Sequence, residues 1–296
     1  MKKKMSKEDF IFNLIGYIAF TLITMICFYP FYYLLICTIS DNQMVAVGKI
    51  TIYPVGIHFT NYVNILKLEN LLSAAQISVM RTVLGTGVGL AVSSYLAYFF
   101  TKQEMWGRKF WYRLVIITMY FSAGLIPGYL NMRMLGLVNT FWVYILPGVS
   151  VYNMILIKTY IESLPASLEE SAVIDGAGYI RRFLQIVLPL SKPILATVGL
   201  FMAVGHWNDF FTTKLYITKP RLYTLQFLLY EYLNQITSAQ NMLEPVDMAA
   251  LDAATSSTTA SVRMTMTAVV VIPIICVYPF IQKYYVKGIM IGAVKG

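Results

Sequence analysis

The sequence predicts an all-α membrane protein with six transmembrane helices and both termini in the cytoplasm. Hydrophobic residues make up 58% of the 296 residues, charged residues only 12%, and the mean hydropathy is +0.64. A soluble chain of this length would carry about twice that share of charge. Six stretches are almost free of charge and close to or above the ~20 residues that a spanning helix needs. They are residues 10–40, 82–101, 114–132, 134–157, 193–213 and 264–282.

The first two helices are predicted at 10–40 and 77–101, since backbone in lipid must satisfy its own hydrogen bonds. The first stretch has no small-residue cleavage site, so we read it as a helix with an irregular end at Pro30 and not as a signal peptide. An outer segment, 41–76, joins the two helices. The inner loop after the second helix carries aromatic residues suited to a membrane interface, namely Trp106, Trp111 and Tyr112.

Helices three and four are predicted at 111–132 and 139–159, as an antiparallel hairpin with a short turn between them. A polar inner insert follows at 160–192 and is expected to form two short helices. Helix five, 193–214, is interrupted only by Asp209.

The remainder contains one more predicted span. Residues 215–262 form a long outer connection, which we expect to have no clear structure, and so long a connection usually serves a function. Helix six is predicted at 264–283 and a cytoplasmic tail at 284–296. We expect one membrane domain over 1–296, with no internal repeat.

Basic residues set the predicted orientation. With a cytoplasmic N-terminus, 15 of the 23 Lys and Arg residues fall inside, which agrees with the rule that cytoplasmic loops are the more positive. The net charge of +9 is therefore a topology signal and not a nucleic-acid footprint. The inner residues are Lys2, Lys3, Lys4, Lys7, Lys102, Arg108, Lys109, Arg113, Lys158, Arg181, Arg182, Lys192, Lys283, Lys287 and Lys295.

Enzyme chemistry and a bound cofactor are not expected of this chain. The three cysteines, Cys27, Cys37 and Cys276, lie in membrane stretches without metal-ligand spacing. The two histidines, His58 and His206, are far apart in the sequence. No nucleophile triad, phosphate loop or dinucleotide fingerprint is recognisable.

The insert has a helical pattern on each side of two glycines. Pro165 fits the first turn of a helix, and Ser167 and Glu170 have capping-box spacing. Leu164, Leu168 and Ala172 form an apolar stripe, from which Glu170 faces away. Gly176 and Gly178 are natural stops. The second helix would bury Ile180, Phe183, Leu184 and Val187 and end at Pro189.

Two interpretations of the insert remain open on these grounds alone. In the first, two short helices joined by glycine form a rigid strut that transmits force. In the second, the insert is an interfacial amphipathic helix that only rests on lipid.

The motif Glu170-Ser171-Ala172-(x)₃-Gly176, followed by Ile186-x-Leu188-Pro189, resembles the EAA loop of ABC importer permeases. The spacing from Gly176 to Ile186 matches that family. Asp175 and Ala177 fit its sugar-importer version, and Ser171 replaces one small residue by another. The resemblance continues at 205–211, 222–226, 277–280 and 287–296. It points to the subgroup that imports polysaccharide fragments and complex oligosaccharides, similar to the maltose and alginate importer permeases.

The resemblance implies a permease of the bacterial cell membrane that pairs with a second permease subunit. Two ABC ATPases carrying ATP and Mg would dock from the cytoplasm, and an extracytoplasmic sugar-binding protein would deliver the substrate. Coupling to the ATPases would involve Glu169, Glu170, Ser171, Ala172, Asp175, Gly176, Ala177, Phe183, Ile186, Leu188 and Pro189. The tail would reach the ATPases through Lys287, Gly288, Gly292 and Lys295, or else be a frayed terminus.

Candidates for the substrate path follow from polarity and aromatic character. Aromatic faces stack on sugar rings, and an acidic residue inside a membrane usually faces a pore or a partner. Arg81 either lines this path or extends to the outer interface. Alternatives are a permease for another solute such as peptides, or an ion-coupled secondary transporter. The candidates are Trp207, Asn208, Asp209, Phe211, Tyr120, Phe121, Asn131, Arg133 and Asn153.

Overall fold

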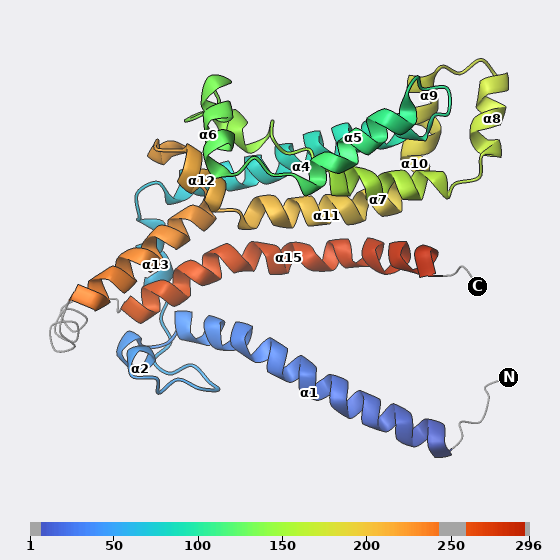
Figure 1. Ribbon diagram of the computed structural model, residues 1–296. Helices are drawn as coiled ribbons and strands as arrows, with labels where there is room; N and C mark the ends of the chain where they lie inside the picture. Colours follow the sequence, from blue (N-terminus) through green and yellow to red (C-terminus); the bar gives the residue numbers. More distant parts are fainter. Residues whose placement is uncertain (1–6, 243–258, 294–296) are drawn as a thin grey trace. The chain divides into compact units, whose positions relative to one another are not determined.

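The computed structural model describes residues 7–242 and 259–293, and every element of secondary structure in these ranges is a helix (Figure 1). The predicted all-α class is therefore confirmed for the described residues. The chain divides into two compact units. Met1–Leu68 and Glu231–Val271 form the first, and Glu69–Tyr230 and Ile272–Gly296 form the second.

The first unit is held together by polar contacts after its long helix. The Asp41 side chain accepts hydrogen bonds from two backbone N–H groups of the next helix and so caps it. Asn61 donates to the backbone oxygen of Thr38 at 3.1 Å and to Asn42 Oδ1 at 2.8 Å. The unit contains α1 (Lys7–Thr38), α2 (Asn42–Ala46), α3 (Thr60–Leu66) and parts of α13 (Leu225–Met242) and α15 (Thr259–Ala293).

Helix α1 is apolar on all sides. Its most apolar 18-residue window contains no buried residue, and only its last residues, Ile36, Cys37 and Thr38, are buried. A helix of this kind is suited to lipid and not to water. Pro30, where we expected an irregular end, lies inside the continuous helix. Proline is tolerated in membrane helices because neighbouring groups satisfy the freed backbone.

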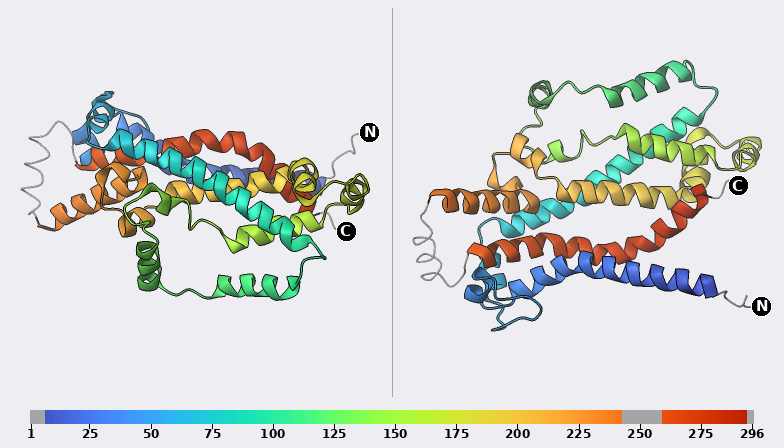
Figure 2. Two further views of the ribbon diagram at one scale, coloured as in Figure 1. Left: turned by 90° about the horizontal axis from the view of Figure 1, so that it is seen from above. Right: turned by 60° about the horizontal axis from the view of Figure 1, so that its bottom comes forward.

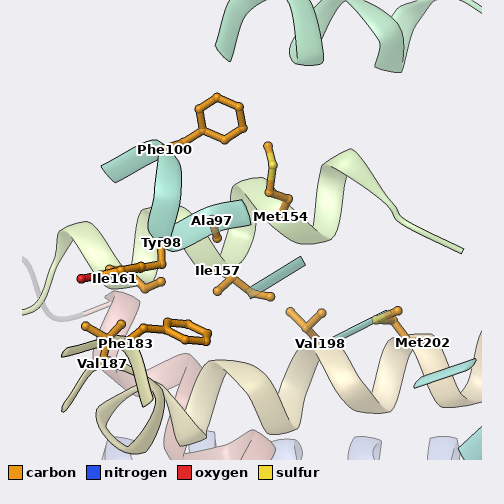
Figure 3. Packing of buried hydrophobic residues seen from close by; sticks show 10 residues of the cluster. All are labelled: Ala97, Tyr98, Phe100, Met154, Ile157, Ile161, Phe183, Val187, Val198 and Met202. Atoms are coloured by element: carbon orange, nitrogen blue, oxygen red, sulfur yellow. The ribbon is translucent and has the colours of Figure 1, made fainter. Parts of the chain in front are cut away.

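The second unit is built around three helices, α4, α7 and α11, which pack against one another (Figure 2). Their shared core includes Tyr98, Met154, Ile157 and Val198, and Figure 3 shows how these side chains meet. The helices of this unit are α4 (Leu71–Thr101), α5 (Arg108–Tyr120), α6 (Leu125–Met134), η1 (Phe141–Tyr144), α7 (Val151–Glu162), α8 (Ser167–Ile174), α9 (Tyr179–Arg182), η2 (Phe183–Val187), α10 (Leu188–Leu190), α11 (Lys192–Asn208), α12 (Phe211–Tyr216) and η3 (Pro220–Leu222).

Small residues allow α4 to approach α11 closely. A Cβ atom added at Gly85 would lie 2.8 Å from the His206 ring, and one added at Gly199 would lie 2.9 Å from Leu90 Cδ1. Membrane helices commonly use such small-residue faces for packing. The buried face of α4 repeats every three or four residues and contains Ala74, Ser78, Arg81, Gly85, Gly89, Ser93 and Ala97.

Three described helices are long and apolar enough to cross a membrane, and the number rises to five if each of two bent pairs is one span. α5 and α6 meet at 118°, and Tyr179–Leu190 meets Lys192–Asn208 at 81°. The three single spans are Lys7–Thr38, Leu71–Thr101 and Thr259–Val277. The chain is therefore an all-helical membrane protein with three to five candidate spans by length and composition.

The predicted third and fourth helices are both interrupted. Between α5 and α6, Gly124 has φ +88°, a conformation that favours glycine, and α6 then starts afresh. Within 139–159, only the 3₁₀ turn η1 forms before Pro147 and Gly148, because proline has no N–H to donate. Helix α7 begins at Val151, where Ser150 Oγ accepts a hydrogen bond from the Asn153 N–H.

Two further boundaries differ from the prediction. Helix α11 ends at Asn208, because Asp209 is extended, with ψ 107°, and accepts a hydrogen bond from the Thr212 N–H at 3.1 Å. The connection 215–262 is not without structure, since it contains the 18-residue helix α13. Buried Leu225, Leu228 and Leu229 begin that helix with an i, i+3, i+4 spacing.

Candidate functional site

The insert contains the two expected helices, and a glycine turn ends the first. The N–H of Ala177 donates to the oxygen of Ala172 at 2.9 Å, and that of Gly176 to the oxygen of Val173 at 3.0 Å. Gly176 has φ +74°, so this is a Schellman motif with glycine in the left-handed position. The expected capping box is absent, because α8 begins with Ala166 as its N-cap and has no side-chain cap.

Glu169, in the first turn of α8, is the centre of a charged cluster. Its carboxylate accepts hydrogen bonds from Tyr98 Oη at 2.7 Å, from Lys102 Nζ at 2.5 Å and from Arg182 Nη1 at 3.2 Å. Burial opposes the charge of Glu169, but the hydrogen bonds and positive charges of Lys102 and Arg182, with Tyr98, outweigh it. The pKa of this carboxyl is therefore held below its ordinary value.

Another part of the α8 surface is open. Glu170 is exposed, and so are Val173 and Ile174, the latter with 87% of its surface accessible. Ala172 is buried, whereas Leu168 of the expected apolar stripe is 43% exposed. This outer face, defined as Glu170, Val173 and Ile174, combines one acidic and two apolar side chains. An exposed set of this kind is suited to a protein partner.

The second insert helix only partly follows the predicted stripe. Phe183 and Val187 are buried, but Ile180 and Leu184 are exposed, and Arg182 is buried in their place. The π-helical turn η2 shifts the register, because Leu188 donates to the Phe183 oxygen five residues earlier.

Pro189 does not end this helix. The helical path continues to Leu190 and bends at Ser191 into α11. The predicted break at Pro189 is therefore wrong by two residues. Proline stands there in the first turn of the short helix α10, directly after the π-helical turn η2.

The predicted ATPase-contacting tail is helical as far as it is described. Lys287, Gly288 and Gly292 belong to α15, which runs to Ala293. Lys295 lies outside the described residues. The alternative of a frayed terminus concerned Gly288–Gly296, and of these residues Gly288–Ala293 are helical.

A polar cavity of about 310 Å³ lies at the other end of α11. Arg81, which is 3% exposed, donates through Nη1 to the backbone oxygen of Asp209 at 2.7 Å and through Nη2 to its carboxylate. The Arg81 guanidinium also lies 4.6 Å from the ring centroid of Tyr144. Asn153, His206 and Thr212 also line the cavity with polar side chains.

Two of the nine predicted path residues, Asp209 and Asn153, line this cavity. The structure places Tyr120, Phe121, Asn131 and Arg133 elsewhere, exposed on or beside α5 and α6. Trp207 is partly buried, and Asn208 and Phe211 are exposed.

Sequence reasoning missed Tyr144, His206 and Thr212 as cavity residues. Arg81 was the available signal, since it is the sole charged residue of α4 and a lone buried charge needs a partner. Among the described residues, no group of three or more His, Cys, Asp or Glu side chains is placed to hold a metal ion.

Comparison with known proteins places this geometry in a family. Residues 85–291 match the family described as "Binding-protein-dependent transport system inner membrane component". The chain is 34% identical over 287 residues to the polygalacturonan/rhamnogalacturonan transport system permease protein YtcP of Bacillus subtilis, covering 97% of this chain and 99% of that protein. It is 28% identical over 306 residues to the galactooligosaccharides transport system permease protein GanQ of the same organism, with 100% of both chains covered.

A solved structure is also similar. It is the crystal structure of a bacterial ABC transporter involved in the import of the acidic polysaccharide alginate. The match has a TM-score of 0.84 and 28% identity, and it covers 96% of this chain and 100% of that chain.

Proposed function

Because this chain belongs to the family of binding-protein-dependent transport system inner membrane components, we propose that it carries oligosaccharides or polysaccharide fragments into the cell. Membership makes it a multi-pass permease of the inner membrane, a transport component that is not itself catalytic. Membership also implies an ATPase and a binding protein as partners.

The saccharide substrate is supported by the similar proteins. One is a permease for polygalacturonan and rhamnogalacturonan, one for galactooligosaccharides, and one belongs to an importer of alginate. Each is similar to this chain over nearly its whole length, so the resemblance includes the residues of any path through the membrane. A peptide permease is the less favoured alternative.

The proposed topology has six crossings with both termini in the cytoplasm. The three long helices supply three crossings, and the bent pair α5–α6 and helix α11 supply two more. Residues 141–162, through η1 and α7, supply the sixth. The excess of basic residues in the loops assigned to the cytoplasm supports this orientation. The insert then lies inside, and the polar cavity lies towards the outside.

The outer face of α8 is the single observation that carries the proposed coupling role. The side chains of this face are exposed among the described residues, and they combine a negative charge with apolar surface. They are Glu170, Val173 and Ile174. We assign this face to an ATPase subunit, with Gly176 holding the turn. The other predicted coupling residues are Glu169, Ser171, Ala172, Asp175, Ala177, Phe183, Ile186, Leu188 and Pro189.

The complete transporter would contain this chain, a second related permease, two ATPases and a binding protein. ATP-driven closure of the ATPases would move the inserts of both permeases together and open the path outward, and hydrolysis would return it inward. A bound saccharide would shift this equilibrium only through its different affinity for the two states. Lys287, Gly288, Gly292 and Lys295 would contact the ATPases from the tail.

We place the substrate path beside the polar cavity, with Asn153 and Asp209 in its wall and Trp207, Asn208 and Phe211 near it. Tyr120, Phe121, Asn131 and Arg133 are candidates because they are exposed on α5 and α6 and available to substrate or to the second permease. Polar groups that converge on a cavity are the usual mark of a small-molecule site.

An ion-coupled secondary transporter would need a membrane carboxylate that is free to bind a proton or a sodium ion. Asp209 is the one carboxylate within the predicted spans, and it is engaged by Arg81. The deciding experiment reconstitutes the permeases, ATPases and binding protein in vesicles and measures uptake of a labelled oligosaccharide. Uptake that requires ATP on the ATPase side and no ion gradient supports the proposal. Uptake that follows a proton or sodium gradient and ignores ATP contradicts it.

A further inference from the structure

Three donors from two other segments converge on one carboxylate of α8. Lys102 stands at the end of α4, Arg182 ends α9, and Tyr98 lies one turn before Lys102. Lys102 reaches both carboxylate oxygens of Glu169, and Arg182 and Tyr98 reach Oε1. Glu169 therefore joins segments separated by 67 and 13 residues in the sequence.

The donors are held in place by aromatic rings and by burial. Lys102 Nζ lies 4.1 Å from the Tyr98 ring centroid, and Arg182 Cζ lies 4.3 Å from that of Tyr179. The side chains of Lys102 and Arg182 are only 14% and 10% exposed. Phe183 packs on Tyr98 with ring centroids 5.3 Å apart. The cations are thus fixed before they meet Glu169, which reduces the entropy lost in forming the cluster.

Little else attaches α8 to the rest of its unit. Ala172 is the single buried residue of this fully described helix. The neighbouring acid Glu170 is exposed and lies about 100° round the helix from Glu169. The two adjacent glutamates therefore face different surroundings, one towards the chain's own cations and one outward.

We infer that Glu169 is a positioning residue that makes α8 move as one body with the inner end of α4. A displacement imposed on the outer face of α8 then reaches the α4–α7–α11 core through the Glu169–Lys102 and Glu169–Arg182 contacts. The inference rests on the proposed docking of an ATPase on α8. The two adjacent glutamates then have different roles. Glu170 binds the ATPase, and Glu169 transmits the movement of the ATPase to the permease core.

The experiment uses the full transporter in vesicles and measures three quantities for each variant: co-purified ATPase, ATP hydrolysed and oligosaccharide taken up. For Glu169→Gln we expect normal ATPase binding and continued hydrolysis. Uptake per ATP should fall by about fivefold or more, the lower end of typical coupling between sites. Glu162→Gln is the matched control, because Glu162 pairs with Lys158 on a more exposed part of the surface and should leave the ratio unchanged.

Exchanging the charges of Lys102 and Glu169 distinguishes a positioning role of Glu169 from a variant that simply fails to fold. Lys102→Glu alone should lower the ratio, and the double variant Lys102→Glu/Glu169→Lys should recover it. A wild-type ratio of uptake to ATP hydrolysed in Glu169→Gln overturns the inference, and recovery in the exchange variant despite the neighbouring Arg182 supports it. If Glu169→Gln releases the ATPases while Glu170→Lys retains them, Glu169 is the docking contact and the inference also fails. If Glu170→Lys and Glu169→Gln both retain the ATPases, the docking proposal fails separately.

Discussion

Arg81 of α4 and Asp209, which follows α11, are joined by two contacts, one to the backbone oxygen and one to the carboxylate of Asp209. The pair connects residues 128 positions apart and holds the point where α11 gives way to α12. Asp209 in turn accepts a hydrogen bond from the N–H of Thr212 at 3.1 Å. One ion pair thus fixes both the packing of α4 and the break after α11.

We predict that Arg81→Met destabilises the folded protein by about 3–5 kcal/mol, because it leaves the Asp209 carboxylate without its partner. The measurement is the thermal unfolding midpoint of the purified chain in detergent. Arg81→Met/Asp209→Leu should recover much of the loss, since no unpaired charge remains. If Arg81→Met has the same unfolding midpoint as the wild type, the Arg81–Asp209 pair contributes nothing to the stability of the fold.

Close packing of α4 on α11 should require glycine at position 85 but not at position 87. A Cβ at Gly85 would lie 2.8 Å from the His206 ring. Among the described residues, nothing beyond the neighbouring part of α4 itself lies within 4 Å of a Cβ at Gly87. Gly85→Leu should therefore cost about 1–3 kcal/mol through overpacking. The yield of monodisperse protein and its melting midpoint measure the effect, and Gly87→Leu is the matched control. Equal behaviour of the two variants would refute close packing of α4 on α11.

The attachment of α8 should depend on pH. Because the folded-state pKa of Glu169 is lowered, its stabilising contribution is complete above the unfolded value, about 4.3, and is lost as pH falls through the lower folded value. Spin labels at exposed Ile174 and Glu104 measure the distance between α8 and the segment after α4. We expect a fixed distance at neutral pH and a broad distribution in acid. For Glu169→Gln we expect a broad distribution of distances at both pH values.

The core helices were predictable because their signal is local. A run without charge identifies α1, α4 and most of α11, and the α4 face can be recognised by its small residues at every third or fourth position. The interruption before α7 was also present in the sequence, as Pro147-Gly148, but it was outweighed by the apolar residues around it.

The site was less predictable because its decisive contacts are distant in the sequence. Arg182 is buried where Glu169 and the Tyr179 ring receive its guanidinium. An apolar periodic pattern does not predict that a basic residue is buried while Ile180 and Leu184 are exposed. The π-helical turn η2 then changes the period after Arg182. The outward position of Glu170, in contrast, follows directly from helix geometry and the buried Ala172.

Asn153 should contribute to transport without affecting assembly. It lines the polar cavity, whereas its neighbour Tyr152 is 56% exposed and does not line it. Loss of one hydrogen bond to a saccharide, worth about 0.5–1.5 kcal/mol, predicts about a two- to tenfold fall in uptake for Asn153→Ala. Tyr152→Ala should transport normally. Unchanged uptake by Asn153→Ala, with normal ATPase content, would remove the cavity from the path.

The most direct test of the whole account is the amount of ATPase that co-purifies with Glu170→Lys from membranes. Glu170 lies on the outer face of α8, and reversing its charge alters no contact within the described chain that holds α8 in place. We predict that the permease is inserted at normal yield but that its ATPases are lost, while Glu162→Lys retains them. ATPases that co-purify with Glu170→Lys at the wild-type ratio would contradict the account.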